Sequence, residues 1–187
     1  MKVIQAPLRE EWASLCRRGT KPMEELGPLV REVFNAVEAQ GDNALLQYTR
    51  QFDGVEVNNL EVDNNQLKMA ADQVPEDLKR AISLAKENIY TFHKAQKLQG
   101  IDIETMPGVR CWQKFQSIEK VGLYIPGGTA PLFSTLLMLA IPAMIAGCKD
   151  ILICTPPRKD GTIDPVILYT AGLCGVTNIF KVGGIQA

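Results

Sequence analysis

The chain contains 187 residues, with 20 Lys and Arg, 21 Asp and Glu, and a formal net charge of −1 at pH 7. This balance, without a basic run, argues against nucleic acid or an anionic membrane surface as the main partner. The length allows one domain or two small ones with a real core. Five scattered cysteines without a C-x-x-C pair indicate reduced, mostly buried thiols in a cytoplasmic protein.

The amino-terminal residues have the pattern of a short strand and a helix, and we expect an arm over residues 1–20. The opening MKVIQAPLREEW lacks the apolar core of a signal peptide. The longest apolar helix candidate, at about residues 132–146, is shorter than the ~20 residues that cross a bilayer, and it contains Pro142. The sequence therefore predicts no membrane-spanning segment and no membrane partner.

Two helices are predicted next. The first runs from Pro22 to Gln40, and Gly41 stands just past its carboxyl end. Asp42 is expected to cap the second helix, which carries Tyr48 and Phe52. The apolar face of the first helix consists of Leu26, Leu29, Val30, Val33, Phe34 and Val37.

A short extended segment and two further helices follow. Residues 55–62 alternate in hydrophobicity, which predicts a strand or the edge of a hairpin. Asp63 is expected to cap a short helix that ends at Ala71. Pro75 fits the first turn of a long helix. The predicted buried stripe of that long helix comprises Leu78, Ile82, Ala85, Ile89 and Phe92.

His93 is the only histidine of the chain and lies on this long helix. Nothing four residues away could share a metal ion with it, because Ile89 and Lys97 occupy those positions. A structural or surface role therefore outweighs a role as a base. No set of His, Asp and Glu has the spacing of metal ligands, so the sequence predicts no zinc site.

The second half of the chain begins with a predicted β-hairpin over residues 101–118, with its turn at Pro107-Gly108. From residue 120 onwards the pattern is β-α-β-α-β, which predicts a parallel sheet. The first of these strands is apolar on both faces, which suggests the middle of the sheet. A covering helix is expected after Gly183-Gly184, without which the third strand would be left bare. The predicted strands are 121–125, 150–154 and 178–182, and the predicted helices begin near Ser134 and at Pro165.

The fold class is therefore predicted as α/β. We expect a helical α+β portion followed by an incomplete parallel Rossmann-like βαβαβ sheet. The predicted division is an arm over 1–20, a helix-rich domain over 21–118 and a Rossmann-like domain over 119–187.

The uncharged stretch VGLYIPGGTAPLFSTLLMLAIPAMIAG, residues 121–147, joins a strand to a helix through a glycine turn. Such turns at the carboxyl edge of a parallel sheet bind ligands, and bare backbone at a helix N-terminus suits phosphates. Gly122 to Thr129 resembles a P-loop, but Gly128 stands where the lysine is required, and G-x-G-x-x-G is absent. The glycines could equally form only a tight turn, so spacing alone leaves both interpretations open.

This stretch, continued by CKDILICTPP, LCGV and VGGIQA, closely resembles the histidinol dehydrogenase family. The resemblance extends back through Gly41–Leu45, Phe52-Asp53, Thr91–Lys97 and Pro107–Val109, and it covers nearly the whole chain. It implies an oxidoreductase that converts L-histidinol to L-histidine through an aldehyde, with two NAD and a bound zinc. It also implies a cytoplasmic homodimer.

Several site residues are implied by the same resemblance. Tyr124 and Gln186 match family residues that contact NAD, and both lie at carboxyl ends of predicted strands. Ser134 could reach into the substrate pocket, although a helix N-cap is the plainer role. The turn beneath the cofactor would be shaped by Pro126, Gly127 and Gly128.

Members of the family are much longer than this chain, and their zinc ligands and Glu-His acid–base pair lie in the carboxyl half. We therefore expect an amino-terminal fragment with no catalytic residue, weak affinity for NAD and no activity by itself. Two alternatives remain. An aldehyde-type dehydrogenase would use a cysteine nucleophile, but Cys148 and Cys154 lack a nearby base. A non-catalytic module would bind nucleotide or pair with a partner through an exposed sheet edge and apolar face.

Overall fold

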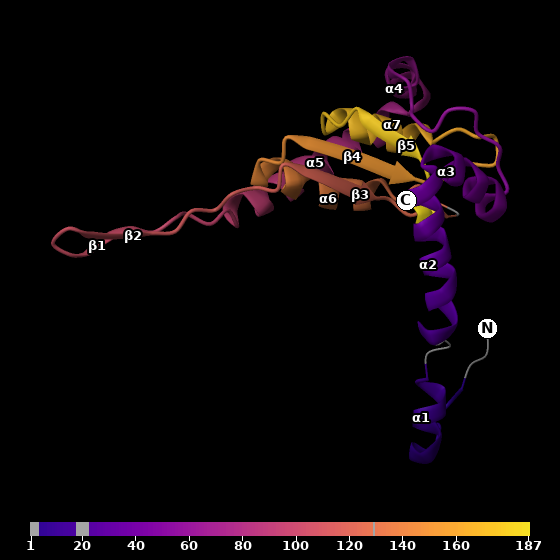
Figure 1. The fold of residues 1–187 in the computed structure, drawn as a ribbon, viewed down its shortest axis with the longest axis horizontal. Helices are drawn as coiled ribbons and strands as arrows, with labels where there is room; N and C mark the ends of the chain where they lie inside the picture. Colours follow the sequence, from indigo (N-terminus) through magenta and orange to yellow (C-terminus); the bar gives the residue numbers. More distant parts are fainter. Residues whose placement is uncertain (1–3, 18–22, 129) are drawn as a thin grey trace.

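The computed structural model describes residues 4–17, 23–128 and 130–187. Figure 1 shows a body of helices around a small sheet, from which a two-stranded hairpin projects. The described part of the amino-terminal arm contains a 3₁₀ turn, η1 (Arg9–Glu11), and the short helix α1 (Trp12–Leu15). The predicted strand is absent from residues 4–17, and positions 1–3 lie outside the described residues. Neither η1 nor α1 has a buried residue.

Helix α2 (Met23–Gln40) is followed by α3 (Asp42–Tyr48) and a π-helical turn, η2 (Thr49–Asp53). The predicted apolar face of α2 is only partly correct, because Val33 is buried whereas Phe34 is 62% exposed. α2 packs mainly against α3 and the last turn of the chain. The prediction that Asp42 caps α3 is wrong, because Gly41 occupies the N-cap with a φ of 56°.

The next elements are α4 (Asn64–Ala70), η3 (Ala71–Gln73) and α5 (Glu76–Ala95). The predicted cap of α4 is confirmed. Oδ1 of Asp63 accepts hydrogen bonds from the backbone N–H groups of Asn65 and Gln66, each at 2.8 Å. The prediction of a buried stripe on α5 is confirmed at Ile82, which is fully buried, and wrong at Phe92, which is 63% exposed. The carboxyl-terminal turns of α5 extend beyond the core, because Tyr90 is exposed there as well.

The predicted parallel βαβαβ unit is confirmed. The sheet order is β3 (Lys120–Tyr124), β4 (Asp150–Thr155) and β5 (Asn178–Lys181), with both pairings parallel. The crossovers are α6 (Phe133–Ala146) and α7 (Pro165–Leu173). This arrangement confirms the α/β fold class, whereas the domain boundaries at residues 20 and 118 stay predictions.

Helices α6 and α7 cover one face of this sheet. Ile153 and Ile179 are fully buried there, and α5 packs on α6 as a further layer. Burying a large aliphatic side chain of this kind contributes about 1.5–3 kcal/mol. The core is therefore continuous from α4 to β5, and it draws on Val62, Ile82, Ile125, Leu136, Leu137, Ile141, Ile153, Ile167 and Ile179.

The other face of the sheet, the open face, is not covered by the described helices. Gly122, Tyr124 and Leu152 are exposed on it, and Cys154 and Phe180 are half-buried. The sheet order β3–β4–β5 follows the chain order, so β3 has a neighbouring strand on one side only. The prediction that β3 lies in the middle of the sheet is therefore wrong for the described chain.

The outer edge of β5 is lined by the segment predicted as a strand at 55–62. Glu61 forms a single antiparallel bridge with Phe180. The N–H of Val62 donates to the carbonyl of Ile179 at 2.9 Å, and that of Lys181 donates to the carbonyl of Leu60 at 2.7 Å. The predicted strand is thus reduced to one bridge. The sequence analysis expected the third strand, β5, to be left bare without a further helix. That expectation is wrong, because residues 60–62 line the outer edge of β5 and Ile179 is buried.

The predicted hairpin is confirmed as β1 (Asp102–Met106) and β2 (Val109–Trp112). Gly108 has a φ of 82° in its turn, a conformation that residues with a Cβ rarely adopt. Every residue of the two strands is exposed. Figure 1 shows the hairpin extending far from the sheet. No helix among the described residues is long and apolar enough to span a membrane.

Candidate functional site

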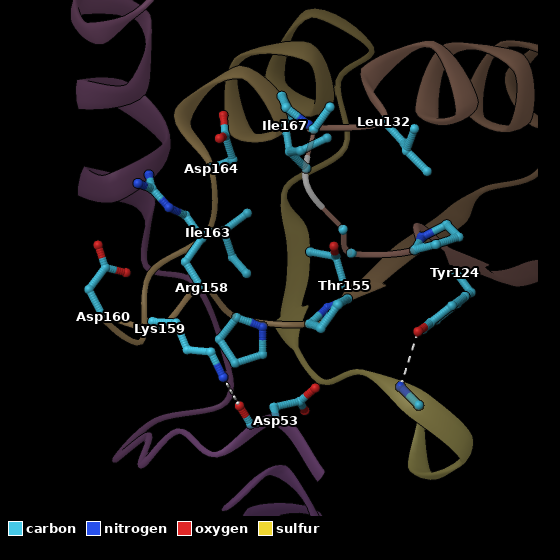
Figure 2. A pocket seen from close by; sticks show the side chains of 18 of the residues that line it. Asp53, Tyr124, Leu132, Thr155, Arg158, Lys159, Asp160, Ile163, Asp164 and Ile167 are labelled. Carbon is cyan, nitrogen blue, oxygen red and sulfur yellow. Dashed lines mark hydrogen bonds between the residues drawn. The ribbon is translucent and has the colours of Figure 1, made fainter. Parts of the chain in front are cut away.

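A cavity of about 910 Å³ opens at the carboxyl ends of β3 and β4. One wall is the turn after β3, and the opposite wall is the loop after β4, residues 156–164 (Figure 2). Phe52 and Asp53 from η2 line it as well, together with Gly184 from the 3₁₀ turn η4 (Gly184–Gln186). The cavity therefore lies where the strand–turn–helix pattern predicts a ligand site.

Tyr124 is the last residue of β3 and lines the cavity. Its side chain is 41% exposed, and its hydroxyl oxygen accepts a hydrogen bond from the N–H of Gly184 at 3.0 Å, shown dashed in Figure 2. The hydroxyl proton stays available for a second partner. Tyr124 thus joins the end of β3 to η4 and presents a donor to the cavity.

The glycine turn combines tight packing with an open backbone. A Cβ at Gly127 would lie 2.4 Å from Cγ of Pro156, so this glycine is required by the contact between the two loops. A Cβ at Gly128 would meet nothing within 4 Å. Pro126, Gly127 and Gly128 all line the cavity. The sequence left two interpretations of the turn open, and each now has its own residue: packing at Gly127 and an accessible backbone at Gly128.

Ser134 is not brought to this cavity. It is an exposed residue of the first turn of α6, and it is not among the cavity-lining residues. The plainer prediction of an N-cap is also wrong, because Leu132 occupies that position without a side-chain hydrogen bond. The chain enters α6 through Pro131 and Leu132, which line the cavity in place of the serine.

Gln186 lies apart from Tyr124 in a second cavity of about 390 Å³, lined by α2 residues including Val33 and Phe34. The side chain of Gln186 is 6% exposed. Its amide oxygen and nitrogen are buried without a hydrogen-bond partner among the described residues. Gly184 connects the two predicted NAD-contacting residues, because its N–H donates to the Tyr124 hydroxyl and it precedes Gln186 by two positions.

Asp53 is a cavity-lining acid that the sequence analysis did not single out. Its Oδ2 is buried and has no hydrogen-bond partner in the described parts of the chain. Burial raises the pKa of the Asp53 carboxyl, and the positive charge of Lys159 partly opposes this shift. The sequence pointed to Asp53 only through the resemblance of the Phe52-Asp53 pair to the family. The burial of the Asp53 side chain depends on the loop after β4, about a hundred positions away, and no local sequence pattern predicts this contact.

The loop after β4 brings two cations to the cavity wall. Nζ of Lys159 donates to the backbone carbonyl of Asp53 at 2.8 Å, which ties this loop to η2 (Figure 2). The N–H of Arg158 donates to the carbonyl of Thr162 at 2.8 Å and closes the turn. Oδ1 of Asp160 accepts from the hydroxyl of Thr162, a hydrogen bond that lowers the pKa of the Asp160 carboxyl. The wall therefore carries both charge signs.

His93 lies outside both cavities. Its Nδ1 is 2.7 Å from Oε1 of Gln96, and its ring meets Phe92 edge-on. These contacts agree with a structural or surface role. Among the described residues there is no group of three or more His, Cys, Asp or Glu side chains that could hold a metal ion.

The cysteines differ from the prediction of mostly buried thiols. All five are free, but only Cys174 is buried, and Cys16 and Cys111 are exposed because α1 and the hairpin are uncovered. Burial raises the pKa of the Cys154 and Cys174 thiols, which disfavours the thiolate. The raised pKa argues against Cys154 as an activated nucleophile.

The family model described as Histidinol dehydrogenase matches residues 16–187. The chain belongs to the histidinol dehydrogenase family. It is 54% identical to the histidinol dehydrogenase of Bacteroides thetaiotaomicron over 187 residues, which are 100% of this chain and 44% of that protein. The histidinol dehydrogenase of Escherichia coli K12 is 47% identical over 92% of this chain and 39% of that protein.

Among solved structures, the crystal structure of histidinol dehydrogenase from Elizabethkingia anophelis is similar, with a TM-score of 0.86 and 46% identity. The match covers 96% of this chain and 42% of that one. The chain thus spans less than half the length of these histidinol dehydrogenases, and it corresponds to an amino-terminal part of them.

Proposed function

We propose that this chain supplies the NAD-binding part of an enzyme that oxidises L-histidinol to L-histidine. The observation that carries the proposal is the cavity at the carboxyl ends of β3 and β4, where α/β proteins bind nucleotides. Family membership supports the oxidoreductase class. By the same resemblance we propose a homodimer in the cytoplasm.

The residues that line the cavity fit a dinucleotide. Tyr124 offers a hydroxyl, Gly128 leaves its backbone open to approach, and Asp53 adds a carboxyl group to the lining. Arg158 and Lys159 place positive charge on the same wall, which suits phosphate oxygens. NAD, when bound, would accept a hydride from the substrate. This chain would hold and orient the cofactor.

The described residues do not fit zinc, because no cluster of metal-ligating side chains exists among them. No residue of this chain is proposed as a zinc ligand, a general acid or a general base. In the proposed enzyme these groups belong to the part of the longer relatives that this chain does not match.

Titration with NAD, followed by NMR chemical shifts so that weak affinities are measurable, tests the proposal. Tyr124→Ala should weaken binding about tenfold, the equivalent of about 1.4 kcal/mol. Tyr90→Ala is the matched control, because Tyr90 is a similarly exposed tyrosine on α5 outside the cavity. An equal effect of the two substitutions, or no saturable binding, would refute the assignment of the cavity.

A further inference from the structure

The loop after β4, residues 156–164, forms one wall of the main cavity, and its central part is closed by its own hydrogen bonds. The N–H of Arg158 donates to the carbonyl of Thr162 at 2.8 Å, and the N–H of Gly161 donates to the carbonyl of Arg158 at 2.9 Å. Residues 158–162, called here the loop tip, therefore form a small turn that holds its own shape.

Both ends of this loop are fixed by neighbouring elements. The ring of Pro156 packs against two glycines, because a Cβ at Gly127 would lie 2.4 Å from one ring atom and a Cβ at Gly183 would lie 2.5 Å from another. At the other end of the loop, Oδ1 of Asp164 accepts a hydrogen bond from the N–H of Val166 at 2.9 Å and caps α7. The position of the loop tip between these ends therefore depends on the contacts that the tip itself makes.

The loop tip packs on η2 and on the residues that follow it (Figure 2). Nζ of Lys159 donates to the backbone carbonyl of Asp53 at 2.8 Å, and a Cβ at Gly54 would lie 3.7 Å from the same Nζ. A Cβ at Gly161 would lie 3.5 Å from the carbonyl oxygen of Glu56, so the two backbones pass close to each other there as well. Among the described residues, the bond from Lys159 is the only hydrogen bond between the loop tip and η2.

This bond joins two parts of the chain that line the same cavity. Phe52 and Asp53 line the cavity from η2, and Lys159 lines it from the loop tip. A hydrogen bond from a charged donor is stronger than a neutral one, but Lys159 is exposed, so water competes for its ammonium group. Loss of this single bond should therefore release the loop tip without unfolding the chain.

We propose that Lys159 is a positioning residue for the nucleotide: its bond to the carbonyl of Asp53 holds the loop tip against η2 and keeps the cavity in the shape that binds NAD. This inference rests on the proposed function, in which NAD is the ligand of the cavity. When only a fraction of the molecules has the competent shape, the measured affinity falls by that fraction. Loss of the bond should therefore weaken NAD binding even without a direct contact between Lys159 and NAD.

The substitution Lys159→Met tests the proposal, because methionine is also a long, flexible side chain but cannot donate the hydrogen bond. Lys149→Met is the matched control, since Lys149 is an exposed lysine directly before β4 and does not line the cavity. Arg158→Met removes a cation from the same wall without removing a bond to η2, so it measures the effect of charge. NMR of each chain gives the affinity for NAD, the order parameters of the loop-tip amides and the carbonyl ¹³C shift of Asp53.

We expect Lys159→Met to weaken NAD binding about fivefold, to lower the order parameters of the loop tip and to change the carbonyl shift of Asp53. Arg158→Met should leave the order parameters and the shift unchanged, and Lys149→Met should leave all three quantities unchanged.

Two results would overturn the proposal while the proposed function stands. One is weaker NAD binding by the Lys159→Met chain without any change at the loop tip, which would indicate a direct contact between the ammonium group and a phosphate. The other is an equal affinity of the Lys159→Met and Lys149→Met chains for NAD. Failure of the unsubstituted chain to bind NAD is a different result, because it refutes the proposed function and this inference with it.

Discussion

Replacing Gly127 by alanine should separate the two loops that wall the main cavity. The added Cβ would lie 2.4 Å from Cγ of Pro156, a ring atom that cannot rotate away. Over-packing costs about 1–3 kcal/mol, and an exposed loop that can yield belongs to the lower part of this range, about 1–2 kcal/mol. For a chain of this size the melting temperature should fall by roughly 2–8 °C.

A double-mutant cycle isolates this contact. Pro156→Ala removes Cγ and Cδ and leaves Cβ at 3.5 Å from the new methyl group, which is an ordinary contact. Gly127→Ala should therefore cost less in the Pro156→Ala background, by about 1 kcal/mol. Gly128→Ala is the control, because its Cβ would meet nothing within 4 Å. Urea and thermal unfolding provide the measurements. Equal costs for Gly127→Ala in both backgrounds would refute the steric reasoning.

Three further predictions concern a carboxyl group, a helix cap and the activity of the chain. Burial raises the pKa of Asp53 in the folded state, so its contribution to stability is present below the unfolded pKa and is lost as the pH rises through the folded value. Asp53→Asn should therefore raise the melting temperature at neutral pH relative to the unsubstituted chain, and the difference should vanish in acid; a constant difference in thermal scans at several pH values contradicts this. Asp63→Ala should destabilise the chain by about 1 kcal/mol in urea, because two N–H groups of α4 lose their acceptor, whereas Glu87→Ala at an exposed position inside α5 is the surface control. The chain alone should form no NADH from histidinol with or without added zinc, and sustained turnover by pure material would disprove this.

The starts of helices were predicted correctly where the residues that determine them lie close together in the sequence. Asp63 caps α4 as expected, and α7 begins at the expected Pro165. The capping box that Gln66 completes with Asp63 was not predicted. Ser134 failed as a cap because the backbone enters the helix two residues earlier, at Leu132. A side-chain type that favours a cap does not fix the position at which the chain turns.

Distant contacts decided what the sequence could not predict. β3 stands at the sheet edge because β4 and β5 follow it in one direction across the sheet, whereas its own composition resembles that of a central strand. Gln186 is buried against α2, which lies at the other end of the chain, and this contact separates it from the cavity of Tyr124. Asp53 lies at the candidate site because Nζ of Lys159 donates a hydrogen bond to its backbone carbonyl, a contact between distant parts of the chain.

The bridge between Glu61 and Phe180 determines at which edge the parallel sheet can be extended by further strands. Because residues 60–62 run along the outer side of β5, that edge has no room for another strand. Within the described chain the outer edge of β3 carries no such cover. Any strand that a longer homologue adds to this sheet would therefore stand next to β3.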